Sequence, residues 1–149
     1  MVVQQETIIE RIQADHEKIF ERIAELERRG AGPRDETVKP VLAPLRTDLL
    51  AHMVAEEEYV YNFLEKEMRS WIENSRREHQ TIRDHLAALA AGGMTRAAWL
   101  GRLQEMRRVL EAHIAEENRA VLPQFEMDYD LEQLRDFGDE YAQREREAQ

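Results

Sequence analysis

The stretch His113-Ile-Ala-Glu-Glu-Asn-Arg-Ala-Val-Leu-Pro123 decides how this chain folds. It continues an apolar repeat of helical period and places Glu117 four residues after His113. Four residues are close to one helical turn, so the imidazole and the carboxylate share one face about 6 Å apart along the axis. His52 and Glu56 form a second pair with the same spacing in another helical segment.

Two further histidines, His16 and His79, lie in other segments of helical pattern. All four histidines fall on the apolar stripes that should face inward. A single buried histidine is usually a hydrogen-bonded core residue. Four on facing stripes, two of them with a glutamate one turn later, favour a shared metal site instead. His85 lies off its stripe, and we expect it to be an ordinary surface histidine.

Apolar periodicity predicts four long helices. The first spans about residues 6–29 and is stopped by Gly30-Ala-Gly-Pro33. The second begins near Pro40 or Pro44, because proline is tolerated in a first turn. The third spans about 70–91, and the fourth starts at the N-cap Thr95 and is ended or bent by Pro123.

Four long helices with short links predict an all-α fold, an up-down-up-down four-helix bundle over about residues 6–123. We expect a short C-terminal helix or tail over about 128–149, and one domain over 1–149. Rise per residue puts His16, His52 and His79 roughly 18–20 Å from one end of the bundle. His113 lies roughly 27 Å from the start of its helix, so the fourth helix should project further at that end.

Composition excludes several classes of function. The chain has 149 residues, a formal charge of −10 and no cysteine. The acidic balance argues against nucleic acid or an anionic membrane as partner, and the lack of cysteine removes disulfides and thiolate metal sites. No apolar run approaches the ~20 residues of a membrane span, and the first residues have no basic region or apolar core of an export signal. We therefore expect a cytoplasmic protein.

Two inward carboxylates in an apolar interior would be costly without a cation, because each resists burial and the two repel. Imidazole and carboxylate donors suit iron, zinc, manganese or copper, and donor type alone does not choose among them. Six donors are too many for one tetrahedral zinc ion, which favours two metals. Ferritin-like carboxylate proteins use Glu-x-x-His, and no histidine here has a glutamate three residues before it.

The paired His-x-x-x-Glu motifs, with lone histidines on the first and third helices, resemble the hemerythrin family in its HHE cation-binding branch. The resemblance runs over about residues 8–125 and is closest around His113-Ile-x-x-Glu117-Asn and Val-Leu-Pro123. It implies a bundle that holds two non-haem iron ions with an oxo or hydroxo bridge. The implied metal ligands are four terminal histidines and two bridging glutamates: His16, His52, His79, His113, Glu56 and Glu117.

Two positions depart from the oxygen-carrying members of that family. They have a second histidine on the third helix, where this chain has Arg83, and an aspartate five residues after the last histidine, where this chain has Glu117 at four. The departures imply more open coordination and argue against reversible oxygen carriage. The donor set is more similar to members implicated in redox sensing, nitric-oxide chemistry or iron–sulfur cluster repair. The repair proteins usually carry a cysteine-containing N-terminal segment, which is missing here.

The resemblance implies a non-haem di-iron protein that binds or senses oxygen, nitric oxide or peroxide, and we expect a sensing module rather than a dedicated enzyme. A sensor would need a signalling partner protein. The alternatives are a di-iron oxidoreductase or an iron–sulfur cluster repair protein, either of which would need an electron donor, and iron or zinc binding without redox function.

Several residues near the motifs have open roles. Tyr59 could hydrogen-bond near the metals or simply pack in the core, and Arg83 could pair with a carboxylate or face solvent. Glu78 is a candidate for lining an access path. Three glutamates are expected to be solvated neighbours: Glu57, Glu58 and Glu116.

Overall fold

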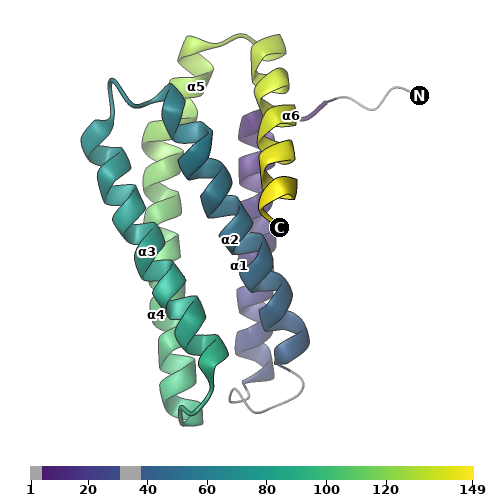
Figure 1. Ribbon diagram of the computed structural model, residues 1–149, viewed down its shortest axis with the longest axis vertical. Coiled ribbons are helices and arrows are strands. Elements are labelled where there is room, and N and C mark those ends of the chain that lie inside the picture. The colour runs from purple at the N-terminus through teal and green to yellow at the C-terminus, as the bar shows by residue number, and fades with distance from the viewer. Residues whose placement is uncertain (1–4, 31–37) are drawn as a thin grey trace.

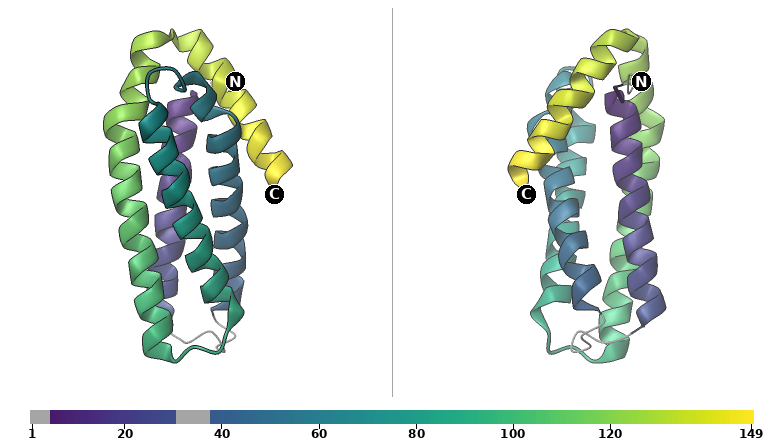
Figure 2. Two further views of the ribbon diagram at one scale, coloured as in Figure 1. Left: turned by 60° about the vertical axis from the view of Figure 1, so that its left-hand side comes forward. Right: turned by 90° about the vertical axis from the view of Figure 1, so that its right-hand side faces the viewer.

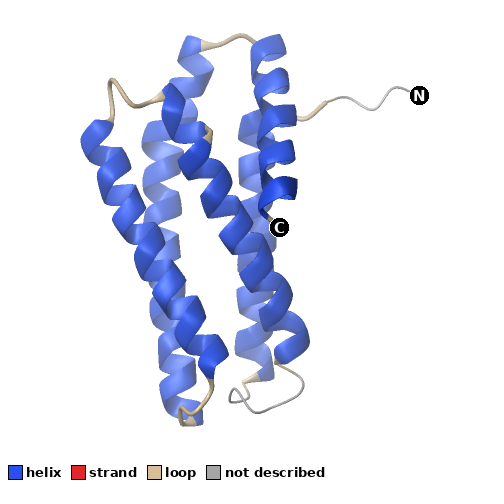
Figure 3. Ribbon diagram, viewed as in Figure 1, coloured by secondary structure: helices blue, strands red, loops and turns tan. Residues whose placement is uncertain are grey.

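The computed structural model describes residues 5–30 and 38–149, and every element in this part of the chain is helical. Four long helices alternate in direction, and α5 and α6 follow them (Figures 1 and 3). The elements are α1 (Ile8–Arg29), α2 (Lys39–Glu58), the 3₁₀ segment η1 (Val60–Phe63), α3 (Arg69–Ala91), α4 (Arg96–Glu116), the π-helical segment η2 (Glu117–Val121), α5 (Leu122–Asp128) and α6 (Leu131–Ala148).

Each long helix contacts the next one along the chain, and α4 returns to α1. This closed ring is the predicted up-down-up-down bundle. Figure 1 shows α4 extending beyond the other long helices at the end where it meets α3, which is the offset that the position of His113 requires. None of the described helices is long and apolar enough to cross a bilayer.

Local sequence explains where the helices begin and end. Thr7 and Glu10 form a reciprocal capping box at the start of α1, and Gly30 ends it with a left-handed conformation (φ 53°) that suits glycine. The rest of the predicted stop, Ala31 to Pro33, lies outside the described residues. Thr95 caps α4 as expected, its hydroxyl accepting a hydrogen bond from the backbone N–H of Ala98.

The positions of the prolines explain where the backbone hydrogen bonding of the helices begins or changes. Pro40 lies in the first turn of α2 and Pro44 lies one turn further inside, so the helix begins at the earlier of the two candidates. Pro123 cannot donate to the carbonyl four residues before it, and the chain widens into η2 just ahead of it before continuing as α5. Two effects of Pro123 were predicted, an end or a bend of the fourth helix, and the structure has the helical path continuing past it.

The second helix ends earlier than its periodicity suggests. Tyr59 leaves the helical region (φ −120°, ψ −59°), and the following residues tighten into η1. A 3₁₀ turn has about 3.0 residues instead of 3.6, so the inward face shifts along the sequence. The buried tyrosine is therefore Tyr61, while Tyr59 is only half-buried and packs on Phe63.

The core consists of two apolar clusters, one towards each end of the bundle. The cluster at the α3–α4 turn contains Ile23, Leu49, Leu86, Trp99 and Leu103 among others. The cluster at the other end contains Ile12, Tyr61, Ile72, Phe125 and Tyr141 among others. On each long helix the predicted metal-binding residues lie where these two clusters meet, so they form a polar layer across the middle of the bundle.

The C-terminal segment is more extensively packed than a tail. A capping box between Asp130 and Gln133 starts α6, which lies across α1 and α2 (Figure 2). The helix approaches the start of the chain closely at Gly138, where a Cβ atom would lie 2.4 Å from the carbonyl oxygen of Glu6.

We expect Gly138→Ala to lower the free energy of unfolding by about 2 kcal/mol, because an added methyl group would meet backbone atoms that cannot move aside alone. The matched control is Gly101→Ala in α4, where an added Cβ meets nothing within 4 Å. That change should instead stabilise the protein by about 0.5–1 kcal/mol through helix propensity. Urea unfolding of the two variants and the wild type measures both effects; equal changes would contradict the close docking of α6.

Candidate metal centre

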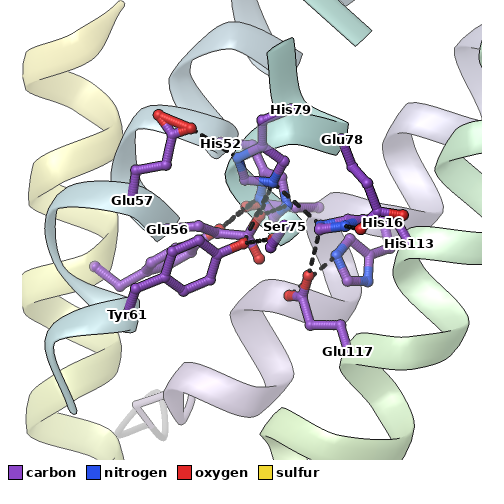
Figure 4. Close-up of polar contacts among 12 residues, drawn as sticks. His16, His52, Glu56, Glu57, Tyr61, Ser75, Glu78, His79, His113 and Glu117 are labelled. Atoms are coloured by element: carbon purple, nitrogen blue, oxygen red, sulfur yellow. Dashed lines mark hydrogen bonds and ion pairs between the residues drawn. The ribbon is translucent and has the colours of Figure 1, made fainter. Parts of the chain in front are cut away.

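The six predicted donors come together in the middle of the bundle (Figure 4). Five lie on the four long helices, and Glu117 is the first residue of η2, which continues α4. All are buried, and Glu56, Glu117 and His79 have no exposed surface. Two groups can be distinguished, in each of which one donor atom per residue lies within 4.8 Å of the others. The first group is His16, His52, Glu56 and Glu117, and the second is Glu56, His79 and His113.

The donor atoms are spaced like the corners of a coordination polyhedron. The Oε1 atom of Glu56 is 3.2 Å from Nε2 of His52 and 3.3 Å from Nε2 of His79. Two atoms bound to one ion at about 2.1 Å lie about 3.0 Å apart at a right angle and about 3.4 Å apart at a tetrahedral angle. The observed spacings therefore suit donors that share a cation.

The Glu117 carboxylate has the same relation to the histidines of its own helix and of α1. Its Oε2 atom is 3.2 Å from Nε2 of His113, and its Oε1 atom is 3.7 Å from Nε2 of His16. The two imidazoles of the second group also face each other, with Nε2 of His79 3.1 Å from Nε2 of His113.

Hydrogen bonding does not account for this arrangement. Both carboxylate oxygens of Glu56, both of Glu117 and Nε2 of His16 are buried without a hydrogen-bond partner of adequate geometry. Buried polar groups are otherwise almost always paired, and each unpaired one costs about 1–3 kcal/mol. Five orphaned donor atoms aimed at one region are what a metal site without its ions should look like, so the residues fit a bound cation.

Burial and mutual repulsion change the proton affinity of the two glutamates. Burial, reinforced by the neighbouring Glu56, raises the pKa of Glu117 to about 8. Burial also disfavours the charged form of Glu56, but the charge of the adjacent His52 outweighs it and lowers the pKa of Glu56 well below its usual range. The pair therefore holds one carboxylate ionised and one protonated near neutral pH, and a cation must displace that proton to bind both.

Two of the imidazoles also have pKa values shifted in opposite directions. Burial, aided by the nearby His52, lowers the pKa of His16 to about 3. Burial disfavours protonation of His113 too, but the nearby Glu117 carboxyl and the hydrogen bond with Glu78 outweigh that and raise the pKa of His113 to about 10. His16 is thus ready to bind a metal, whereas His113 must first lose a proton.

A carboxylate orients the imidazole of His52. Asp15 Oδ2 lies 2.9 Å from Nδ1 of His52, and an ionised carboxylate can only accept, so Nδ1 carries the hydrogen. In the neutral ring the lone pair is then on Nε2, which faces the other donors. The hydroxyl of Tyr141 on α6 lies 2.7 Å from the same Nδ1 and donates to Asp15 at 2.6 Å.

A second carboxylate does the same for His79. Glu57 Oε2 accepts from Nδ1 of His79 at 2.9 Å. Arg83 holds Glu57 with two hydrogen bonds of 2.7 and 3.1 Å. The hydrogen bonds from His79 and Arg83 outweigh the effect of burial and lower the pKa of Glu57 to about 2. Glu57 is therefore not the solvated neighbour that we expected, and Arg83 pairs with a nearby carboxylate, one of the two roles left open for it.

The third carboxylate, Glu78, accepts from Nδ1 of His113 at 3.1 Å. Its role is to support a histidine as well as to line the surface groove between α3 and α4. All three supporting carboxylates are chain neighbours of a site residue and reach the histidine on the next helix. The pairs are Asp15 with His52, Glu57 with His79, and Glu78 with His113.

Tyr59 packs on Phe63, one of the two roles left open for it, because α2 ends before it. Tyr61 approaches the site instead, with its hydroxyl 3.3 Å from Nε2 of His79 and in contact with Ser75 (Figure 4). One other expectation is wrong. His85 is buried rather than on the surface: its Nδ1 lies 3.4 Å from a guanidinium nitrogen of Arg102 between α3 and α4. Glu58 and Glu116 are exposed as expected.

Sequence reasoning found the six inward donors but missed Asp15, Tyr61 and Tyr141. The one feature of the sequence that could have indicated Asp15 as a site residue is its position next to His16. The shift of phase in η1 hid Tyr61, and nothing in the local pattern connects Tyr141 with a histidine 89 residues earlier.

A family model, the Hemerythrin HHE cation binding domain, matches residues 7–125. The chain belongs to this family. Searches of curated proteins and of solved structures found no significant match. The match to the HHE cation-binding family covers the four long helices and the whole buried cluster, and α6 lies beyond it.

Exchanging Glu117 for Gln removes one charge without changing the shape of the side chain. We expect Glu117→Gln to retain less than half of the wild-type metal, because the amide cannot replace an ionised donor. The neighbouring exposed Glu116, which pairs with Arg119, supplies the matched control Glu116→Gln. Elemental analysis of both purified variants measures the effect; similar metal content in the two would contradict the placement of Glu117.

The same variant tests the cost of burying Glu117 without metal. A carboxyl with a folded-state pKa of about 8 and an ordinary value of 4.5 destabilises the fold increasingly as pH rises between these two values. At pH 7, metal-free Glu117→Gln should therefore be more stable than metal-free wild type by about 1–3 kcal/mol, and the difference should vanish near pH 4. Chelator-treated samples unfolded in urea at the two pH values provide the measurement.

Proposed function

We propose that this chain is one hemerythrin-like domain that holds two non-haem iron ions and binds or senses a small oxidant such as oxygen, nitric oxide or peroxide. The observation that carries the proposal is the sharing of Glu56 between two donor groups, one with His16 and His52 and the other with His79 and His113. One metal would use one group; two groups joined by buried carboxylates favour a pair.

The proposed ligands are the six residues expected from the sequence: His16, His52, Glu56, His79, His113 and Glu117. A bound iron pair supplies two adjacent redox-active centres able to exchange electrons with a small oxidant. The protein supplies the rest. Asp15, Glu57 and Glu78 hold the proton on Nδ1 of their histidines, so that Nε2 keeps its lone pair towards the centre.

The size of the space favours a very small ligand. A cavity of about 10 Å³ is enclosed by the four histidines, Glu56 and the apolar residues next to them. This volume is about that needed for one water molecule, so the space does not admit an organic substrate. Hemerythrin-like domains bind small ligands such as oxygen.

Tyr61 offers a hydrogen-bond donor to such a ligand. Its hydroxyl reaches the donors from η1, and burial together with the nearby Glu56 and Glu117 raises its pKa well above the ordinary value, so it remains protonated. Arg83, at the position where the oxygen-carrying members have a fifth histidine, is held outside the cluster by Glu57. Four histidines and two carboxylates leave open coordination positions on two metals.

Stoichiometry is the first test of this proposal. We expect two iron ions per chain when the protein is produced with sufficient iron and purified without a chelating tag. Elemental analysis of the iron content, divided by the protein concentration, gives the number of iron ions per chain. A plateau at one metal per chain would refute the two-metal centre, and a plateau of two zinc ions with no iron would favour metal binding without redox function.

Reaction with oxygen is the second test. We expect the anaerobically reduced, iron-loaded protein to be oxidised by oxygen and to stay oxidised when the oxygen is removed, because the open positions do not protect a bound ligand. Absorption spectra recorded before oxygen, after oxygen and after its removal follow the reaction, with Glu117→Gln as the control that lacks the full centre.

A spectrum that disappears on deoxygenation and returns with oxygen would instead make the protein a carrier. Repeated consumption of peroxide or nitric oxide with a supplied reductant would favour an oxidoreductase, and a single stoichiometric event would favour a sensor.

A further inference from the structure

Helix α6 belongs to the site although it lies outside the residues that match the family. The matched region ends at residue 125, and α6 begins at Leu131. The helix crosses α1 and α2 (Figure 2). Its docking is fixed near the start of α1, where Gly138 permits the close backbone approach and Asp139 contacts Gln5 and Arg11.

Tyr141 is the residue of α6 whose side chain contacts a predicted metal ligand through its hydroxyl group. Its side chain is fully buried, and its hydroxyl forms a triangle with Asp15 Oδ2 and His52 Nδ1, with sides of 2.6, 2.7 and 2.9 Å. The hydroxyl donates to Asp15, so it fixes the carboxylate that in turn fixes the imidazole. A carboxylate oxygen of Glu145, also on α6, lies within 4.8 Å of donor atoms of Asp15 and His52, at the edge of a surface pocket that Asp15 and Glu145 line together.

The two donor groups differ in their dependence on α6. In the second group, Glu57 is clamped by Arg83 from α3 and Glu78 supports His113, and none of these residues contacts α6 through a hydrogen bond or ion pair. In the first group, His52 depends on Asp15 and Tyr141. Among the described residues, none forms a hydrogen bond with Nδ1 of His16, so His52 is the oriented imidazole of that group.

We propose that Tyr141 is a positioning residue for His52, and that α6 thereby controls the retention of the metal ion bound by His16 and His52 but not of the ion bound by His79 and His113. This inference rests on the proposed two-metal centre. Loss of an outer hydrogen-bond partner of a ligating histidine typically weakens metal binding about 10- to 100-fold. The effect should therefore be large, and it should be confined to one of the two ions.

The test follows the release of ferrous iron from the reduced, two-iron protein to a colorimetric ferrous chelator in the absence of oxygen. We expect Tyr141→Phe to release one of its two iron equivalents about 10- to 100-fold faster than the wild type and the other at the wild-type rate. The matched control is Tyr59→Phe, which removes a phenol hydroxyl from a half-buried tyrosine that packs on Phe63 beside α6. It should release both equivalents at wild-type rates.

Two outcomes would overturn the inference. Tyr141→Phe could release both equivalents at wild-type rates, or it could release both faster to the same degree together with a lower melting temperature of the metal-free protein, which would indicate a structural role only. Should that variant not fold, Gly138→Ala displaces α6 while keeping the phenol, and it should accelerate the same single equivalent. A wild-type protein that binds only one iron would refute the proposed centre itself, which the stoichiometry reveals before any variant is compared.

Discussion

Two carboxylates fully buried within one layer of the bundle are the constraint on which this structure depends. Glu56 and Glu117 have no exposed surface and no hydrogen-bond partner of adequate geometry, and the imidazoles around them do not neutralise both. A closely packed interior would normally exclude such a pair. The apolar clusters on either side hold the helices together, and the layer between them keeps donors that only a cation can satisfy. The packing of the apolar clusters therefore stabilises a fold in which two buried carboxyl groups are held in an unfavourable environment.

Much of the fold follows from the sequence because helical periodicity is a local property. The stripes through His16, His52, His79 and His113 needed only the spacing of apolar residues to be recognised as inward-facing. The glutamate one turn after His52 and the one after His113, on two of the four helices, indicated a metal site. These are features that a residue shares with its neighbours three and four positions away, and the sequence displays them directly.

Features that depend on geometry between helices could not be predicted in this way. Tyr61, and not Tyr59, lies next to the site because a short 3₁₀ segment changes the number of residues per turn. His85 is off its own stripe but is covered by the neighbouring helix α4, so its burial reflects packing rather than periodicity. Tyr141 reaches His52 only because Gly138 lets α6 approach α1 closely, a contact between the two ends of the chain.

The supporting carboxylates also favour one handedness of the bundle over the other. Asp15 is one residue before a site residue on its helix, Glu57 one residue after, and Glu78 one residue before. A right-handed helix turns about 100° per residue, so alternating the offset between antiparallel helices moves each carboxylate in the same rotational sense around the bundle axis. With the helices arranged in the opposite sense, the same apolar stripes would still face inward. The carboxylates, however, would point away from the imidazoles and leave three buried Nδ1–H groups without acceptors, at about 1–3 kcal/mol each. The hydrophobic pattern therefore permits two mirror-related arrangements of the helices, and the polar layer selects one.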